Sequence, residues 1–257
     1  MNSVWNESAL AGKNALVVCP ENGWGKEIVA GLKNAGAKVY LAGPNEAEMK
    51  SLTADLALAG YTVYDHRTHS QTLAMANAVV GELGSIDILV ENSSQTEMRG
   101  WEQTYEQIND QLQLTHLGMM LTVQTVGNVM AKQRSGSVIL MTDTAALTGY
   151  DPYNYTNAAE RFDEDFSLVK GFIYGGAVNY ARQAAGFLGE NGCRCNALAC
   201  APRLENDGFA EGYLRHSHIK SPVTGEDVSS AVIFLASDGA ARITGVTLPV
   251  DGGYTAK

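Results

Sequence analysis

Short apolar runs alternate with segments of helical periodicity along the whole chain, and this rhythm restricts the fold more than any other feature. The first run, ALVVC at residues 15–19, is followed by a turn that contains glycine and then by KEIVAGL at residues 26–32, which has helical spacing. The apolar runs predict seven strands, at residues 15–19, 38–42, 62–64, 86–90, 137–141, 194–198 and 246–250. The segments between them predict helices at residues 26–32, 46–59, 71–83, 101–132, 169–190 and 227–236. This alternation predicts an α/β protein with one doubly wound, Rossmann-type sheet of seven parallel strands, with ligands at the carboxyl ends of the strands.

One domain accounts for the length of the chain. A chain of 257 residues with 45% hydrophobic residues can bury a complete core, and neither an internal repeat nor a linker divides it. We therefore expect a single domain over residues 1–257. Residues 144–168 interrupt the rhythm, because they lack periodicity and are rich in tyrosine and acidic side chains. We interpret this segment as an irregular insertion at the mouth of the active site.

The charge of the chain opposes several kinds of partner. The net charge of −10 disfavours nucleic acid and anionic membranes, and no run of 18 apolar residues predicts a membrane span. Residues 1–12 show no basic region followed by an apolar segment, so we expect a cytoplasmic protein. The spacing of the four cysteines matches no pattern of zinc ligands, so we predict no metal site and expect reduced cysteines in the core.

Several segments together carry a family resemblance. They are LAGKNALVV at residues 10–18, IDILV at 86–90, GCRCNA at 192–197, and FLASD at 234–238 followed by TG at 244–245 and VDGG at 250–253. On these segments the chain resembles the short-chain dehydrogenase/reductase family over nearly its whole length. The resemblance implies a nicotinamide dinucleotide at the ends of the strands and hydride transfer assisted by a Tyr acid.

The glycine turn after the first strand follows the family only in part. In the family, the glycines let backbone amides and a helix N-terminus approach the pyrophosphate. Gly23 and Gly25 match the last two of these glycines, but Val18 and Cys19 stand where Thr and the first Gly are expected. A Cys side chain at this turn would push against the adenosine ribose or require altered backbone angles.

Two further positions complete the cofactor site that the resemblance implies. Asp65 matches a family Asp that contacts the adenine, and Asn92 lies in ENSS at residues 91–94, where the family has Asn-Asn-Ala-Gly. After the second strand, Gly43 and Pro44 supply neither an acid for a ribose hydroxyl nor an Arg for a phosphate, so NAD and NADP are not distinguished. We expect Gly23, Gly25, Asp65 and Asn92 to form a vestigial or weak NAD(P) site.

The catalytic positions depart further from the family. The resemblance places Thr115 at the catalytic Asn and Asp143 at the Ser. Lys170 and Tyr174 stand at the Tyr and Lys positions in reverse order, so each group lies about one helical turn from where it is needed. If the helix instead carried a four-residue insertion, Phe166 and Lys170 would align as the pair, and the Tyr acid would still be missing. Glu205 lies near the Thr that binds the carboxamide in the family.

Two functional interpretations remain open. In the first, the chain is a non-catalytic subunit of a heteromeric short-chain alcohol dehydrogenase, in which a homologous catalytic subunit holds NAD(P). The losses are similar to those in degenerate subunits of the hydroxyacyl-CoA dehydrogenases of anaerobic toluene degradation. Residues 101–132 and 169–190 would form the interface, in a complex that we expect to be a tetramer. In the second, the chain is an active but atypical NAD(P)-dependent reductase that uses Tyr155 or Tyr174 with Lys170.

Overall fold

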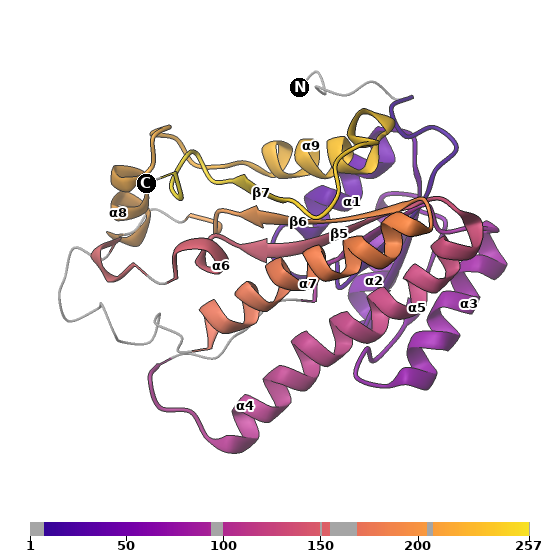
Figure 1. Cartoon of the computed structure of the whole chain (residues 1–257), viewed down its shortest axis with the longest axis horizontal. Coiled ribbons are helices and arrows are strands. Elements are labelled where there is room, and N and C mark those ends of the chain that lie inside the picture. Colours follow the sequence, from indigo (N-terminus) through magenta and orange to yellow (C-terminus); the bar gives the residue numbers. More distant parts are fainter. Residues whose placement is uncertain (1–7, 94–99, 150, 155–168, 205–207, 257) are drawn as a thin grey trace.

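A single parallel sheet forms the centre of the protein (Figure 1). The computed structural model describes residues 8–93, 100–149, 151–154, 169–204 and 208–256. Within these residues, seven parallel strands lie in the order β3-β2-β1-β4-β5-β6-β7. Their bounds are β1 (Asn14–Val18), β2 (Lys38–Gly43), β3 (Gly60–Val63), β4 (Ile88–Glu91), β5 (Gly136–Asp143), β6 (Cys193–Cys200) and β7 (Thr247–Val250). The predicted fold class is confirmed, and all seven predicted strands are present.

Helices cover both faces of the sheet. Those in the described residues are α1 (Gly25–Asn34), α2 (Glu46–Asp55), α3 (His69–Leu83), α4 (Tyr105–Leu112), α5 (Gly118–Gln133), α6 (Ala145–Thr148), α7 (Lys170–Glu190), α8 (Gly208–His216) and α9 (Gly225–Ala236). Figure 1 shows α1 and α9 on one face and α3, α5 and α7 on the other. Because side chains alternate along β1, Leu16 packs into the core under α3, α5 and α7, whereas Val17 packs into the core under α1 and α9. None of the described helices is long and apolar enough to cross a membrane.

The prediction of one long helix at residues 101–132 was wrong in two respects. The observed helix begins at Tyr105, directly after a capping box formed by Thr104 and Gln107. A π-helical segment, Gln113–Leu117, then separates α4 from α5. The Nε2 atom of His66 lies 2.6 Å from the Leu114 carbonyl oxygen and donates to it, while the Gly118 amide bonds to Gln113 instead. A side chain that binds a helix carbonyl in this way displaces the regular α-helical pairing.

Other features also differ from the sequence prediction. Helix α2 ends at Asp55 and not at residue 59, because the chain turns through Ala57 with φ +46°. Helix α8 was not predicted at all. The insertion at 144–168 is partly regular, since it contains α6 and a 3₁₀ turn at Pro152–Asn154, while residues 155–168 lie outside the described residues.

Helix α8 holds the described part of this insertion against the body of the protein. A β-carbon at Gly212 would overlap the Asn154 carbonyl, so the two backbones meet at a distance that only glycine allows. The Asn154 side chain donates to the Tyr254 hydroxyl at 2.8 Å and lies 3.1 Å from His216 Nδ1. Residues 151–154 are therefore fixed between α8 and the C-terminal segment.

Candidate functional site

The carboxyl ends of the central strands bring most of the predicted site residues to one edge of the sheet. Val18 pairs with Glu91 where β1 and β4 end, and Asp143 pairs with Cys200 where β5 and β6 end. The chain crosses from one half of the sheet to the other between β1 and β4, and ligands bind at such a switch point in open α/β sheets. This edge is the candidate functional site.

An acid and a base form an ion pair at the positions expected for the catalytic Ser and Tyr. Asp143 ends β5, and its Oδ1 accepts from the Ala145 amide at 2.8 Å and from the Thr144 hydroxyl at 3.3 Å. Its Oδ2 lies 3.7 Å from Lys170 Nζ, and the side chains of Asp143 and Lys170 are 16% and 33% exposed. Neither position therefore carries a hydroxyl that donates a proton to a substrate oxygen.

Tyr174 lies one helical turn further along α7, inside the core. It is 3% exposed, and its backbone carbonyl accepts from the Thr142 hydroxyl at 3.0 Å. The Lys170 ammonium lies 5.8 Å from the centre of its ring. Lys170 and Tyr174 are thus neighbours, as the sequence predicted, but the aromatic residue is buried while the lysine faces Asp143. Tyr155, the other proposed acid, lies outside the described residues.

Thr115 lies within the π-helical segment. It is 1% exposed, and its hydroxyl donates to the Gln111 carbonyl at 2.8 Å, one turn earlier in the same helix. Its oxygen also lies 3.1 Å from His116 Nδ1. Burial lowers the pKa of His116. The Thr115 hydroxyl is therefore bonded within its own helix at the position where the family has an Asn.

The loop after β1, residues 19–25, which we call the β1–α1 loop, has an unusual backbone. Cys19 has φ +51°, in the left-handed region that glycine adopts readily, at the position where the family has a glycine. Asn92 Nδ2 donates to the carbonyls of Cys19 and Asn22 at 3.0 and 2.8 Å, and Asn22 Nδ2 donates to the Asn92 carbonyl at 3.1 Å. Gly25 packs so closely on Pro20 that a β-carbon would overlap its backbone. Asn92 therefore acts as the anchor of this loop.

The Cys19 side chain continues into a buried chain of contacts. Its Sγ lies 4.0 Å from Nδ1 of His66, whose Nε2 donates to Leu114. Burial raises the pKa of the Cys19 thiol well above its usual value, and the nearby carboxyls of Glu21 and Glu91 raise it further. Cys19 is thus a neutral packing residue and not a nucleophile.

A contact that the sequence did not predict joins the β1–α1 loop to the loop after β6. Arg203 donates from Nε and Nη2 to the Gly23 carbonyl at 3.0 and 2.9 Å, and it also binds Glu27. Its guanidinium stacks 4.2 Å from the centre of the Trp24 ring, and Trp24 Nε1 donates to the Ala201 carbonyl at 2.9 Å. We call this set of contacts the Arg203 strap. No local pattern reveals it, because its two halves are about 180 residues apart.

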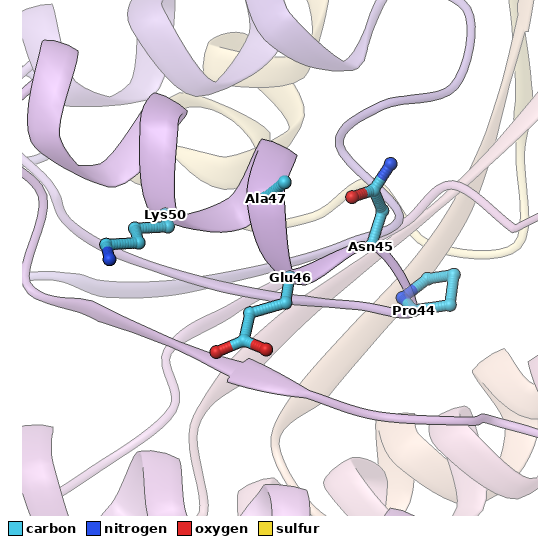
Figure 2. Close-up of a pocket in the computed structure, with 5 residues that line it drawn as sticks. All are labelled: Pro44, Asn45, Glu46, Ala47 and Lys50. Atoms are coloured by element: carbon cyan, nitrogen blue, oxygen red, sulfur yellow. The ribbon is translucent and has the colours of Figure 1, made fainter.

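The adenosine side of the site is also modified. Asp65 binds Arg67 at 2.7 Å, and this contact lowers the pKa of the Asp65 carboxyl to about 2. A hollow of about 630 Å³ lies at the end of β2 (Figure 2). Its lining includes Glu46 and Lys50, both on α2, as Figure 2 shows. The region after β2 therefore offers both an acid and a base, although the sequence suggested neither at Gly43 and Pro44.

Cys19 and Cys200 lie at this edge, whereas Cys193 and Cys195 lie at the start of β6. All four are buried and free, at Cys19, Cys193, Cys195 and Cys200. Among the residues that the structure describes, no group of three or more His, Cys, Asp or Glu side chains is placed to hold a metal ion.

Comparison with known proteins extends these observations. Residues 18–255 match a family model described as enoyl-(acyl carrier protein) reductase. The chain is 28% identical to the D-threitol dehydrogenase of Mycolicibacterium smegmatis, over 96% of this chain and 95% of that protein. It is 26% identical to a 3-oxoacyl-[acyl-carrier-protein] reductase of Chlamydia muridarum, over 96% and 98% of the two chains. The structure of a short-chain type dehydrogenase/reductase from Mycobacterium ulcerans superposes with a TM-score of 0.84 at 22% identity, over 97% of this chain and 92% of the other.

Proposed function

Because the chain belongs to the short-chain dehydrogenase/reductase family, we propose that it is the non-catalytic subunit of a heteromeric short-chain alcohol dehydrogenase. The observation that carries the proposal is the ion pair between Asp143 and Lys170. In the family, these two positions supply the hydroxyls that exchange a proton with the substrate. An ammonium held by a carboxylate has no such hydroxyl, and the phenol of Tyr174 belongs to a buried residue.

The β1–α1 loop supports the same proposal. A Cys side chain replaces the first glycine of this turn, and the Arg203 strap covers Trp24 and binds the Gly23 carbonyl where the family places the pyrophosphate. Asp65, the expected adenine contact, is already bound to Arg67. We therefore assign NAD(P) to the partner subunit, together with hydride transfer, and the resemblance suggests a hydroxyacyl-CoA as its substrate class.

An exposed apolar face supports the presence of a partner. Met120 on α5 and Phe172 and Phe187 on α7 are 42%, 69% and 56% exposed. A groove of about 520 Å³ between α6 and α7 adjoins Phe172, and its lining includes Leu147 and three glycines together with Asn179 and Arg182. Helices α5 and α7 belong to the two segments that the sequence predicted as an interface, and exposed aromatic side chains are typical of binding surfaces. We propose that the homologous catalytic subunit covers this face.

Nucleotide titration of the purified chain tests the proposal. NADH and NADPH should show no saturable change in nucleotide fluorescence below about 1 mM, whereas an intact subunit of this family should bind in the micromolar range. Purification from the native host should recover a second short-chain subunit, and only the complex should oxidise or reduce substrate. Micromolar affinity of the isolated chain for either nucleotide would contradict the proposal.

Substitutions in the reconstituted complex provide a sharper test. Lys170→Ala and Tyr174→Phe in this chain should leave kcat within about twofold of the unmodified complex, because neither group contacts substrate. The matched control is the Tyr→Phe substitution of the partner's catalytic acid, which should lower kcat by about 100-fold or more.

One observation favours a second candidate, an active but atypical reductase. Lys170 lies over the ring of Tyr174, so a cation is close to a phenol on the same helix. If the chain purified alone reduces a ketone with NADH or NADPH, Tyr174→Phe should abolish that activity. Loss of activity in this variant, with unchanged folding by circular dichroism, would establish the second candidate in place of the first.

A further inference from the structure

One carboxyl group lies entirely inside the floor of the candidate site. Glu91 is the last residue of β4, between Val18 of β1 and Leu140 of β5, and it is 0% exposed. Neither of its carboxyl oxygens makes a hydrogen bond of good geometry with a described residue; only the hydroxyl and amide of Ser93 are close enough to interact with it, and the Ser93 hydroxyl has no other partner among the described residues. A polar group that is buried without partners is costly, and a charged one more so.

The groups around Glu91 do not compensate its charge. The titratable neighbours are the Cys19 thiol at the end of β1, the Tyr64 hydroxyl after β3 and the Tyr180 hydroxyl on α7, all of them neutral. Among the described residues, Ser93 is the only group that lowers the pKa of Glu91, and no Lys, Arg or His among them does so. Burial outweighs the effect of Ser93 and raises the pKa of the Glu91 carboxyl to about 7.

Glu91 is directly joined to the anchor of the β1–α1 loop. Asn92, the next residue, makes three hydrogen bonds with Cys19 and Asn22, and it is itself 3% exposed. The loop continues through Gly23 and Trp24 into the Arg203 strap. A carboxylate that moves toward water from the end of β4 must displace Asn92 and with it these contacts.

We propose that Glu91 is a proton-binding site that controls the β1–α1 loop. With Glu91 neutral, Asn92 holds the loop closed under the Arg203 strap. With Glu91 ionised, the carboxylate leaves the core, Asn92 releases Cys19 and Asn22, and the loop opens. This regulation of the β1–α1 loop requires neither a nucleotide nor a partner subunit, so its test does not depend on the function proposed above.

Glu21 is the competing candidate for such control. It lies on the β1–α1 loop itself, its Oε2 is buried without a hydrogen-bond partner among the described residues, and burial raises its pKa. Glu21→Gln is therefore the matched control, because it removes a half-buried acid from the loop and leaves Glu91 in place.

Hydrogen exchange of the β1–α1 loop, read by mass spectrometry at about pH 6 and about pH 8.5, tests the proposal. After correction for the intrinsic exchange rate, amides 22–25 of the native chain should lose about 30-fold in protection between these two pH values. This factor is expected because pH 8.5 lies about 1.5 units above the Glu91 pKa of about 7. Glu91→Gln should show no such loss, and Glu21→Gln should show the same loss as the native chain. An unchanged pH response in Glu91→Gln, or its disappearance in Glu21→Gln, would overturn the proposal.

Infrared spectroscopy of the native chain tests the protonation of Glu91 even if Glu91→Gln does not fold. A neutral buried carboxyl has a carbonyl band separate from that of ionised carboxylates. In the native chain and in Glu21→Gln this band should disappear between pH 6 and pH 8.5, in parallel with the loss of exchange protection. If no such band is present at pH 6, Glu91 is not protonated and the proposal is wrong.

Discussion

Individual residues in this protein adopt backbone angles that their side chains disfavour. Among the described residues other than glycine, Cys19, Ala57 and Arg134 have positive φ, at 51°, 46° and 61°. Cys19 is held by its buried surroundings and by Asn92, whereas Ala57 is exposed and only ends helix α2. The energetic cost of the left-handed conformation is therefore easiest to measure at Ala57.

Replacing Ala57 with Gly should stabilise the protein by about 1 kcal/mol, because glycine adopts the left-handed region without steric cost. Ala54→Gly is the matched control. Ala54 is also exposed but lies inside α2, so glycine there should destabilise by about 0.5–1 kcal/mol. Urea denaturation at constant pH measures both effects. Equal destabilisation by the two substitutions would show that Ala57 is not strained.

The buried carboxyl of Glu91 should make stability depend on pH. Its pKa is about 7 in the folded protein, above the ordinary value of 4.5. The protonated carboxyl therefore favours the folded state. This contribution to the free energy of unfolding is fully present below about pH 4.5, and it is lost as the pH rises through 7. Glu91→Gln should raise the free energy of unfolding at pH 8 by about 3 kcal/mol relative to the native chain, and by much less at pH 5. A pH-independent difference, measured by urea denaturation at both values, would contradict this assignment.

At the residue scale, the sequence predicted which positions meet but not how they interact. The alignment of motifs placed Asp143, Lys170 and Tyr174 at one site, and the first two do form a pair. The Arg203 strap was missed because cation–ring stacking and hydrogen bonds to the Gly23 carbonyl depend on tertiary approach and leave no periodic signal. The isolation of Glu91 was missed for the same reason, since a lack of partners is a property of the folded core.

The interrupted helix α4–α5 shows how tertiary contacts decide the form of an element. The periodicity of residues 101–132 predicted one continuous helix, but His66, from a segment about 50 residues earlier, binds the Leu114 carbonyl. Gly118 makes room for the His66 ring, because a β-carbon there would overlap it. The central strands β1, β2, β4, β5 and β6 were easier to predict, since each is an apolar run that is buried on both faces of the sheet.

Gly118→Ala should destabilise the protein by about 2 kcal/mol or more, because the added methyl group must displace a buried ring. Gly81→Ala in α3 is the matched control, since nothing lies within 4 Å of its β-carbon position. In that open helical position alanine should stabilise by about 0.5–1 kcal/mol. Thermal unfolding should therefore move Tm in opposite directions for the two variants, and a rise in both would show that the His66 ring moves freely.

At the scale of the whole molecule, the protein presents an apolar face on α5 and α7 beside a net negative charge of −10. Both helices belong to the core through their opposite faces, which bury Val126 and Ala181. The exposed side chains Met120, Phe172 and Phe187 do not belong to the described core. We expect these side chains to stabilise the complex with the partner subunit.

Phe172→Asp should weaken the complex with the partner subunit by about tenfold or more in Kd, because it places a charge in the apolar face. Ile219→Asp is the control, since Ile219 is similarly exposed, at 63%, but follows α8. Light scattering of the purified complexes should show dissociation of the first variant at concentrations where the second remains assembled. Dissociation of both, or of neither, would place the interface elsewhere.

The pairing of Asp143 with Lys170 also constrains how this sequence can change over evolutionary time. Asp143→Ser alone would leave the Lys170 ammonium without its counter-ion and would remove the acceptor for the first amide of α6. Lys170→Tyr alone would leave the Asp143 carboxylate, which is mostly buried, without its cation. Each single step toward the hydroxyl pair of the family thus passes through a less stable protein. The two positions are therefore coupled, so that reversion at either one is disfavoured while the other keeps its present residue.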